Sequence, residues 1–180
     1  MGSDGDASKI DNAGNVWTYT FDNRGRLTEV VETNSGALVM DKQFVYDVNN
    51  NLIATILNGT PQHWTVWDGK NPYLEFDGTG NPTQREVADP RTLNALFGQV
   101  SASGQVEFYL TDQQHSVRMI VSASGNALDQ ITYDAYGNIL SQTNAANASF
   151  YLFQGGYFDG DLGLNRFGAR WYSTNNGSSD

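Results

Sequence analysis

Short runs of strand-forming residues are each followed by a polar turn, and this alternation recurs along most of the chain. In the first run, residues 18–21 (TYTF), Tyr19 and Phe21 would share one face of an extended strand while two threonines share the other. Runs rich in aromatic and β-branched residues are typical of strands. We therefore predict strands at residues 18–21, 44–46, 64–67, 108–111, 131–133 and 157–158.

An aspartate follows each of these runs, and a seventh, Asp89, follows the weaker run Val87-Ala88. The seven aspartates recur at steps of 21 to 25 residues. An aspartate side chain accepts backbone N–H bonds from residues shortly after it, which fixes a turn. We predict turn-forming roles for Asp22, Asp47, Asp68, Asp89, Asp112, Asp134 and Asp159.

A second set of turns, rich in Gly, Asn and Ser, falls half a period later. Each period thus holds two strands and two turns, which is the pattern of antiparallel hairpins that pair edge to edge. The pattern predicts an all-β fold in which antiparallel β-hairpin repeats form a curled or spiralling sheet, with no helix. The second turns lie at residues 34–36, 58–59, 78–81, 103–104 and 124–126.

The repeats indicate one β-sheet domain over residues 16–172. Residues 1–15 are interpreted as an N-terminal lead-in, and residues 173–180, dominated by Ser, Asn and Gly, as a flexible tail. A sheet with one aromatic face must curl or be covered, and its two end strands leave backbone groups unpaired. We therefore expect self-association through the sheet edges.

Residues 133–140 (YDAYGNIL) resemble the YD (tyrosine-aspartate) repeat of bacterial Rhs proteins, which are related to the teneurins. The block at residues 153–172 (FQGGYFDGDLGLNRFGARWY) is similar to the C-terminal part of an Rhs core. The resemblance is strongest after Phe108. It implies a non-catalytic structural fragment of a shell that encapsulates a C-terminal toxin or cargo, or of a cell-surface protein. It also implies secretion or a cell-surface location, with the parent shell or a toxin cargo as partner.

The chain departs from the family pattern at two places. His115 stands where the family commonly has Gly. The family motif continues into an Asp-Pro self-cleavage segment, which residues 173–180 do not contain. Acid–base autoproteolysis needs two carboxylates close together. Asp159 and Asp161 are the candidate pair, because they lie nearest to that region. A remnant of an autoprocessing aspartyl protease core without its cleavage site is therefore an alternative, although turn formation is the favoured role of Asp159.

Composition excludes several kinds of chemistry. The formal net charge of −10 opposes binding to nucleic acid, which is itself a polyanion. No run approaches the roughly 20 apolar residues that span a bilayer. With no Cys and two distant His, no zinc spacing is present, and the calcium-like start at Asp47 lacks its later Gly and Glu. We expect no metal, no cofactor and no enzymatic activity.

Three aromatic residues, Trp64, Trp67 and Tyr73, could stack on a ligand such as a sugar ring. Packing within the sheet is the competing and favoured interpretation of these side chains. They support the main alternative function, a carbohydrate- or protein-binding adhesion module built on the same sheet.

Overall fold

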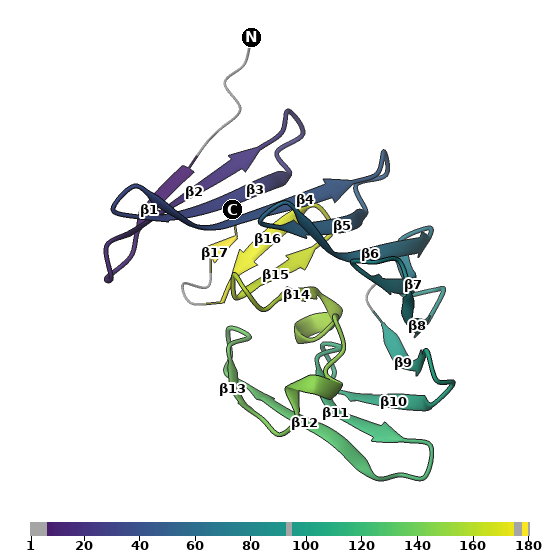
Figure 1. The fold of residues 1–180 in the computed structure, drawn as a ribbon. Helices are drawn as coiled ribbons and strands as arrows, with labels where there is room; N and C mark the ends of the chain where they lie inside the picture. Colours follow the sequence, from purple (N-terminus) through teal and green to yellow (C-terminus); the bar gives the residue numbers. More distant parts are fainter. Residues whose placement is uncertain (1–6, 93–94, 175–177, 180) are drawn as a thin grey trace. The chain divides into compact units, whose positions relative to one another are not determined.

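The computed structural model describes residues 7–92, 95–174 and 178–179. The predicted all-β antiparallel fold is confirmed, and the described residues contain no α-helix, only two 3₁₀ turns. Thirteen strands pair in chain order in one sheet. Figure 1 labels these strands and colours them by their position in the sequence. They are β1 (Ala7–Ile10), β2 (Asn15–Phe21), β3 (Leu27–Asn34), β4 (Ala37–Tyr46), β5 (Leu52–Leu57), β6 (Thr60–Asp68), β7 (Asn71–Asp77), β8 (Pro82–Ala88), β9 (Leu96–Ser101), β10 (Val106–Thr111), β11 (Val117–Ser122), β12 (Ala127–Tyr133) and β13 (Ile139–Gln142).

The chain divides into two compact units. The first comprises residues 1–65 and 76–81, and the second residues 66–75 and 82–180. In the first unit, alternate positions of β4 are buried, as the period of two requires, whereas the two buried residues of β3 are three positions apart. Val30 pairs with Lys42 across the two strands, and both are buried. The buried apolar residues of this unit are Leu27, Val30, Met40, Phe44, Leu52 and Ala54.

Two of the predicted second turns in the first unit are two-residue hairpins. Ser35-Gly36 joins β3 to β4 and Asn58-Gly59 joins β5 to β6. Both residues of each turn have positive φ, at 49° and 83° in the first and 49° and 76° in the second. This is the conformation that matches the twist of paired strands, and Asn and Gly adopt it most readily. These turns therefore set the register of their hairpins.

The second unit contains a separate sheet that the repeat pattern did not predict. After β13 and a short 3₁₀ turn, η1 (Ala145–Asn147), the chain reaches a second turn, η2 (Phe153–Gly155). It then forms a four-stranded antiparallel sheet, separate from the 13-stranded one. The strands are β14 (Tyr157–Asp159), β15 (Leu164–Phe167), β16 (Arg170–Ser173) and β17 (Ser178–Ser179).

Apolar packing holds the segment between the two sheets against the first one. Leu152 and Phe153 form a buried cluster with Ile131 and Tyr133 of β12. The carbonyl of Leu152 also accepts the backbone N–H of Val117 in β11, at 3.0 Å. We call residues 149–157 the crossing segment. Its burial accounts for the break in the repeat, because it covers part of the sheet instead of extending it.

Both chain ends contain strands where the sequence suggested irregular structure. β1 lies within the interpreted lead-in, residues 1–15, and pairs with β2. β17 lies within the interpreted tail, residues 173–180, and pairs with β16. Residues 1–6, 175–177 and 180 lie outside the described part of the chain.

Candidate functional site

The turn at Asp22, between β2 and β3, shows how an aspartate ends a strand. Its Oδ1 accepts hydrogen bonds from the backbone N–H groups of Arg24 at 2.9 Å and Arg26 at 3.0 Å. The Gly25 N–H donates to the Asp22 carbonyl at 2.9 Å, and the Asp22 N–H donates to the Arg26 carbonyl at 3.0 Å. One side chain thus satisfies two backbone donors, so the turn needs no partner elsewhere.

The same bonding recurs at Asp47, Asp112 and Asp134. Their Oδ1 atoms accept the N–H groups two and four residues further on, at 2.8–3.0 Å. Two aspartates outside the predicted set, Asp11 and Asp77, make these bonds as well, at 2.8–3.0 Å. The unit that repeats is therefore a locally bonded turn, which occurs more often than the 22-residue spacing indicated.

A left-handed residue three positions after the aspartate is the common feature of these turns. A serine replaces the aspartate at Ser101 and Ser122, whose hydroxyl oxygens accept the N–H four residues on at 3.1 Å. Asp or Ser followed three residues later by Gly marks six of these eight turns, and Asn or His takes the glycine position in the other two. The left-handed residues, with φ between 65° and 93°, are Gly14, Gly25, Asn50, Gly80, Gly104, His115, Gly125 and Gly137.

The other three predicted aspartates lie in different turns. Asp68 ends β6, and only two residues separate it from β7. Asp89 Oδ1 accepts the N–H of Arg91 at 2.9 Å, in a longer loop to β9. Asp159 Oδ1 accepts the N–H of Leu162 at 3.1 Å and the residue is buried, whereas Asp161 is exposed. Asp159 and Asp161 thus occupy unlike environments.

Hydrogen bonds favour the charged form of two turn aspartates, Asp77 and Asp134. The backbone N–H of Asn81, with the Thr79 hydroxyl and the Asn81 side chain, lowers the pKa of Asp77 to about 2. The side-chain amide of Asn138, 2.6 Å from Oδ2, is the main cause that lowers the pKa of Asp134. A carboxylate that accepts several N–H bonds is stabilised relative to its protonated form. These aspartates are therefore ionised turn residues.

The second unit contains a buried cluster of carboxyl and hydroxyl groups that the sequence did not predict. Glu75 of β7 is fully buried and Glu86 of β8 is 3% exposed. Burial, together with the charge of Glu75, raises the pKa of Glu86 to about 8. Burial and a neighbouring negative charge both disfavour the ionised form of a carboxyl group. Glu86 therefore carries a proton at neutral pH.

The hydrogen bonds around Tyr109 agree with a neutral Glu86. The Tyr109 hydroxyl oxygen lies 2.6 Å from Gln99 Oε1 and 3.1 Å from Glu86 Oε2. A hydroxyl has only one hydrogen, and an amide oxygen can only accept, so Tyr109 donates to Gln99. The second contact is then satisfied when protonated Glu86 donates to Tyr109. Gln84 Nε2 donates to the other oxygen, Glu86 Oε1, at 2.5 Å, and Gln99 Nε2 donates to Glu107 Oε2 at 2.6 Å.

The crossing segment closes this cluster. The Tyr151 hydroxyl donates to Glu75 Oε1 at 3.0 Å, across 76 positions of sequence. Ser149 accepts the Tyr151 backbone N–H at 3.0 Å and also hydrogen-bonds Tyr109. Burial raises the pKa of both tyrosines well above the usual value, so both hydroxyls remain protonated. The cluster thus anchors the crossing segment to strands β7 to β10.

The three aromatic residues considered for ligand stacking lie in unlike positions. Trp64, in the first unit, is 39% exposed. In the second unit, Trp67 is half-buried, and its ring meets that of Tyr151 edge to face, with centroids 6.4 Å apart. Tyr73 of β7 is 45% exposed. Trp67 therefore packs within the protein, while the rings of Trp64 and Tyr73 remain accessible.

Metal and membrane sites receive no support from the described residues. Among them, no three His, Asp or Glu side chains are grouped so that they could hold a metal ion. The helical segments in the same residues are also too short and too polar to cross a bilayer.

Comparison with known families identifies the repeat. Residues 91–178 match the teneurin YD-shell family, and residues 3–37 match the RHS repeat. The chain belongs to the Rhs/YD-repeat family. The resemblance drawn from residues 133–140 and 153–172 is thereby confirmed.

Two kinds of relative support this Rhs/YD-repeat assignment. A tRNA3(Ser)-specific nuclease, WapA of Bacillus spizizenii, is 29% identical over 170 residues, which cover 89% of this chain and 7% of WapA. The crystal structures of TcdB2-TccC3 and TcdB2-TccC3-TEV match with TM-scores of 0.63 and 0.65 at 16% and 17% identity. They cover 88% and 91% of this chain, and each match spans 9% of the solved chain. The chain therefore spans less than a tenth of these relatives, and the solved structures establish a shared fold.

Proposed function

We propose that this Rhs/YD-repeat chain is a non-catalytic structural segment of a shell. The observation that carries the proposal is the locally bonded turn, repeated at eight positions from Asp11 to Asp134 on a sheet whose strands follow one another in chain order. Each turn satisfies its own backbone groups, so hairpins can be added without new long-range contacts. A repeat of this kind suits a wall of variable length.

In this proposal the shell encloses a C-terminal toxin or another cargo, and the protein is secreted or displayed at the cell surface. The similarity to the YD-shell family and to the TcdB2-TccC3 fold supports this role. End strands of a sheet have free backbone groups that pair readily with further strands. The rest of the parent shell is the partner that would meet those edges.

The buried cluster supports a structural role better than a catalytic one. Glu75 and Glu86 are 0% and 3% exposed, and they bond to Tyr151 and Tyr109, respectively. Asp159 and Asp161, the pair nearest to the family's cleavage region, differ in exposure, and Asp159 bonds to its own turn. We therefore favour a proton-bearing anchor over an autoprocessing site.

Limited proteolysis of the longer protein that contains this segment tests the shell role. If the sheet is part of an enclosing wall, the region downstream of it should be cut only after the wall is damaged. Asp134→Ala, which removes two turn bonds, should hasten that cleavage, whereas Asp68→Ala, which removes none of that type, should not. Equal cleavage of the downstream region in all three proteins would contradict the proposal.

An adhesion module remains the second candidate, because the rings of Trp64 and Tyr73 are accessible. A glycan array would separate the two functions. Binding that is lost in Trp64→Ala, with the β-sheet circular dichroism spectrum unchanged, would favour adhesion. If the wild-type protein binds no glycan, or if Trp64→Ala leaves glycan binding unchanged, the shell function is favoured.

A further inference from the structure

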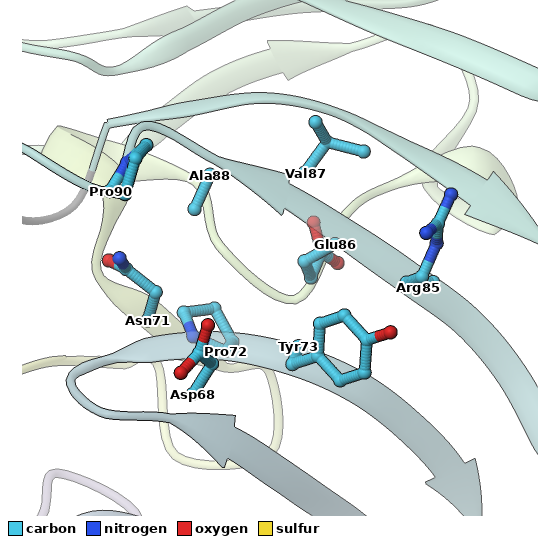
Figure 2. Close-up of a pocket in the computed structure, with 9 residues that line it drawn as sticks. All are labelled: Asp68, Asn71, Pro72, Tyr73, Arg85, Glu86, Val87, Ala88 and Pro90. Atoms are coloured by element: carbon cyan, nitrogen blue, oxygen red, sulfur yellow. The ribbon is translucent and has the colours of Figure 1, made fainter.

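A pocket of about 280 Å³ opens in the second unit beside β7 and β8 (Figure 2). Asp68, Asn71, Pro72 and Tyr73 line it from one strand pair, and Arg85 to Ala88 and Pro90 line it from the other side. Figure 2 shows the Glu86 side chain between the two strands, with the Tyr73 ring beside it. Pro72 and Pro90 lack a backbone N–H, so neither donates a backbone hydrogen bond at the pocket.

The walls and the rim of this pocket differ in chemistry. Apolar surface comes from Pro72, Tyr73, Val87, Ala88 and Pro90, and Tyr73 supplies an accessible aromatic ring. A ring of this kind packs well against the C–H face of a flat, partly apolar ligand.

The polar rim provides both donors and acceptors. Asp68 offers a carboxylate, Arg85 a guanidinium and Asn71 an amide with one donor group and one acceptor. In the described part of the chain, these three side chains make no hydrogen bond or ion pair with protein groups. They are therefore available to a ligand.

Charge and size limit what the pocket can take. The rim holds one negative and one positive group, and the whole chain carries −10, so an anion gains little and is repelled at long range. A metal ion would need more oxygen ligands than Asp68 and Asn71 provide. The volume of about 280 Å³ lies just below the range of typical small-ligand pockets, about 300–1,000 Å³, so only a small ligand fits. An uncharged ring with several hydroxyl groups satisfies all of these limits.

We propose that the pocket of Asp68, Asn71, Tyr73 and Arg85 binds one pyranose ring of a neutral glycan, with a face of the sugar against Tyr73. This site is additional to the shell role, which does not require it. A single small sugar in such a site should bind weakly, with a dissociation constant on the order of 1–10 mM.

Saturation-transfer and amide chemical-shift NMR test the site with four probes: the methyl glycosides of glucose, galactose, mannose and N-acetylglucosamine. At least one should perturb amides confined to residues 68–73 and 85–90. Tyr73→Ala should weaken binding at least about 10-fold, and Asn71→Ala should also weaken it. Tyr136→Ala is the matched control, because Tyr136 is 59% exposed and lies outside the pocket.

Three results would overturn the proposal. One is the lack of any shift at about 50 mM of all four probes. Another is a set of amide shift changes that lie outside residues 68–73 and 85–90, or a loss of sugar binding in Tyr136→Ala as large as that in Tyr73→Ala. The third is preferential binding of inorganic phosphate at these residues, which would assign the pocket to an anion. Because Tyr73 and Asn71 are not fully buried, an unchanged amide spectrum of each variant away from the pocket will show that it has folded.

Discussion

Replacing Glu86 by Gln should make the protein more stable at neutral and alkaline pH. Glutamine keeps both hydrogen bonds of the neutral acid: its Oε1 accepts from Gln84, and its Nε2 donates to Tyr109 where the carboxylic O–H does so in the wild type. The variant lacks only the proton that can be lost. The expected effect therefore comes from ionisation and not from packing.

The magnitude follows from the pKa of Glu86, which rises from 4.5 to about 8 on folding because of burial and the nearby charge of Glu75. Between these two pH values the folded protein holds a proton that the unfolded chain releases. The free energy of unfolding therefore falls as pH rises, by about 1.4 kcal/mol per pH unit and about 5 kcal/mol in all. The stabilising contribution is complete below pH 4.5 and is lost by pH 8.

Urea unfolding followed by tryptophan fluorescence, in steps from about pH 5 to about pH 8, measures this slope. Glu86→Gln should be flatter than the wild type over that range and more stable by about 3 kcal/mol at pH 7. Glu29→Gln, the same change at a partly exposed carboxylate in the first unit, is the control. Parallel pH profiles for the wild type and Glu86→Gln would refute the raised pKa of Glu86.

Four further substitutions concern turns and the crossing segment, and each is measured by urea unfolding at pH 7. Gly125→Ala should cost about 1 kcal/mol because φ is 82°. Gly137→Ala should cost roughly 1–3 kcal/mol more, since its Cβ would lie 2.5 Å from the Phe153 ring, and equal losses would contradict that packing. His115→Gly should stabilise by roughly 0.5–1 kcal/mol by relieving φ of 65°, and a loss would argue that the imidazole is needed. Tyr151→Phe should cost about 2 kcal/mol by removing a buried hydrogen bond, and no loss would mean that this bond does not anchor the crossing segment.

Local rules explain why most of the first sheet was predictable. Strand alternation depends on neighbouring residues alone, and so does the turn at Asp22, whose bonds end within four residues. The 22-residue period still missed Asp11 and Asp77, whose local bonds end within four residues and do not depend on that spacing. The short strand β8 was also weakly signalled, since Pro82–Ala88 contains few strand formers.

The sequence by itself thus determined the strands, the self-contained turns and the family. The tertiary structure alone decided the second sheet, the pocket and the cluster that joins Glu75 to Tyr151. Alternation says which side chains of a strand share a face, but it cannot say which distant segment will cover that face. Whether a glutamate stays charged in water or holds a proton in the interior depends on that cover, because burial sets the cost of its charge.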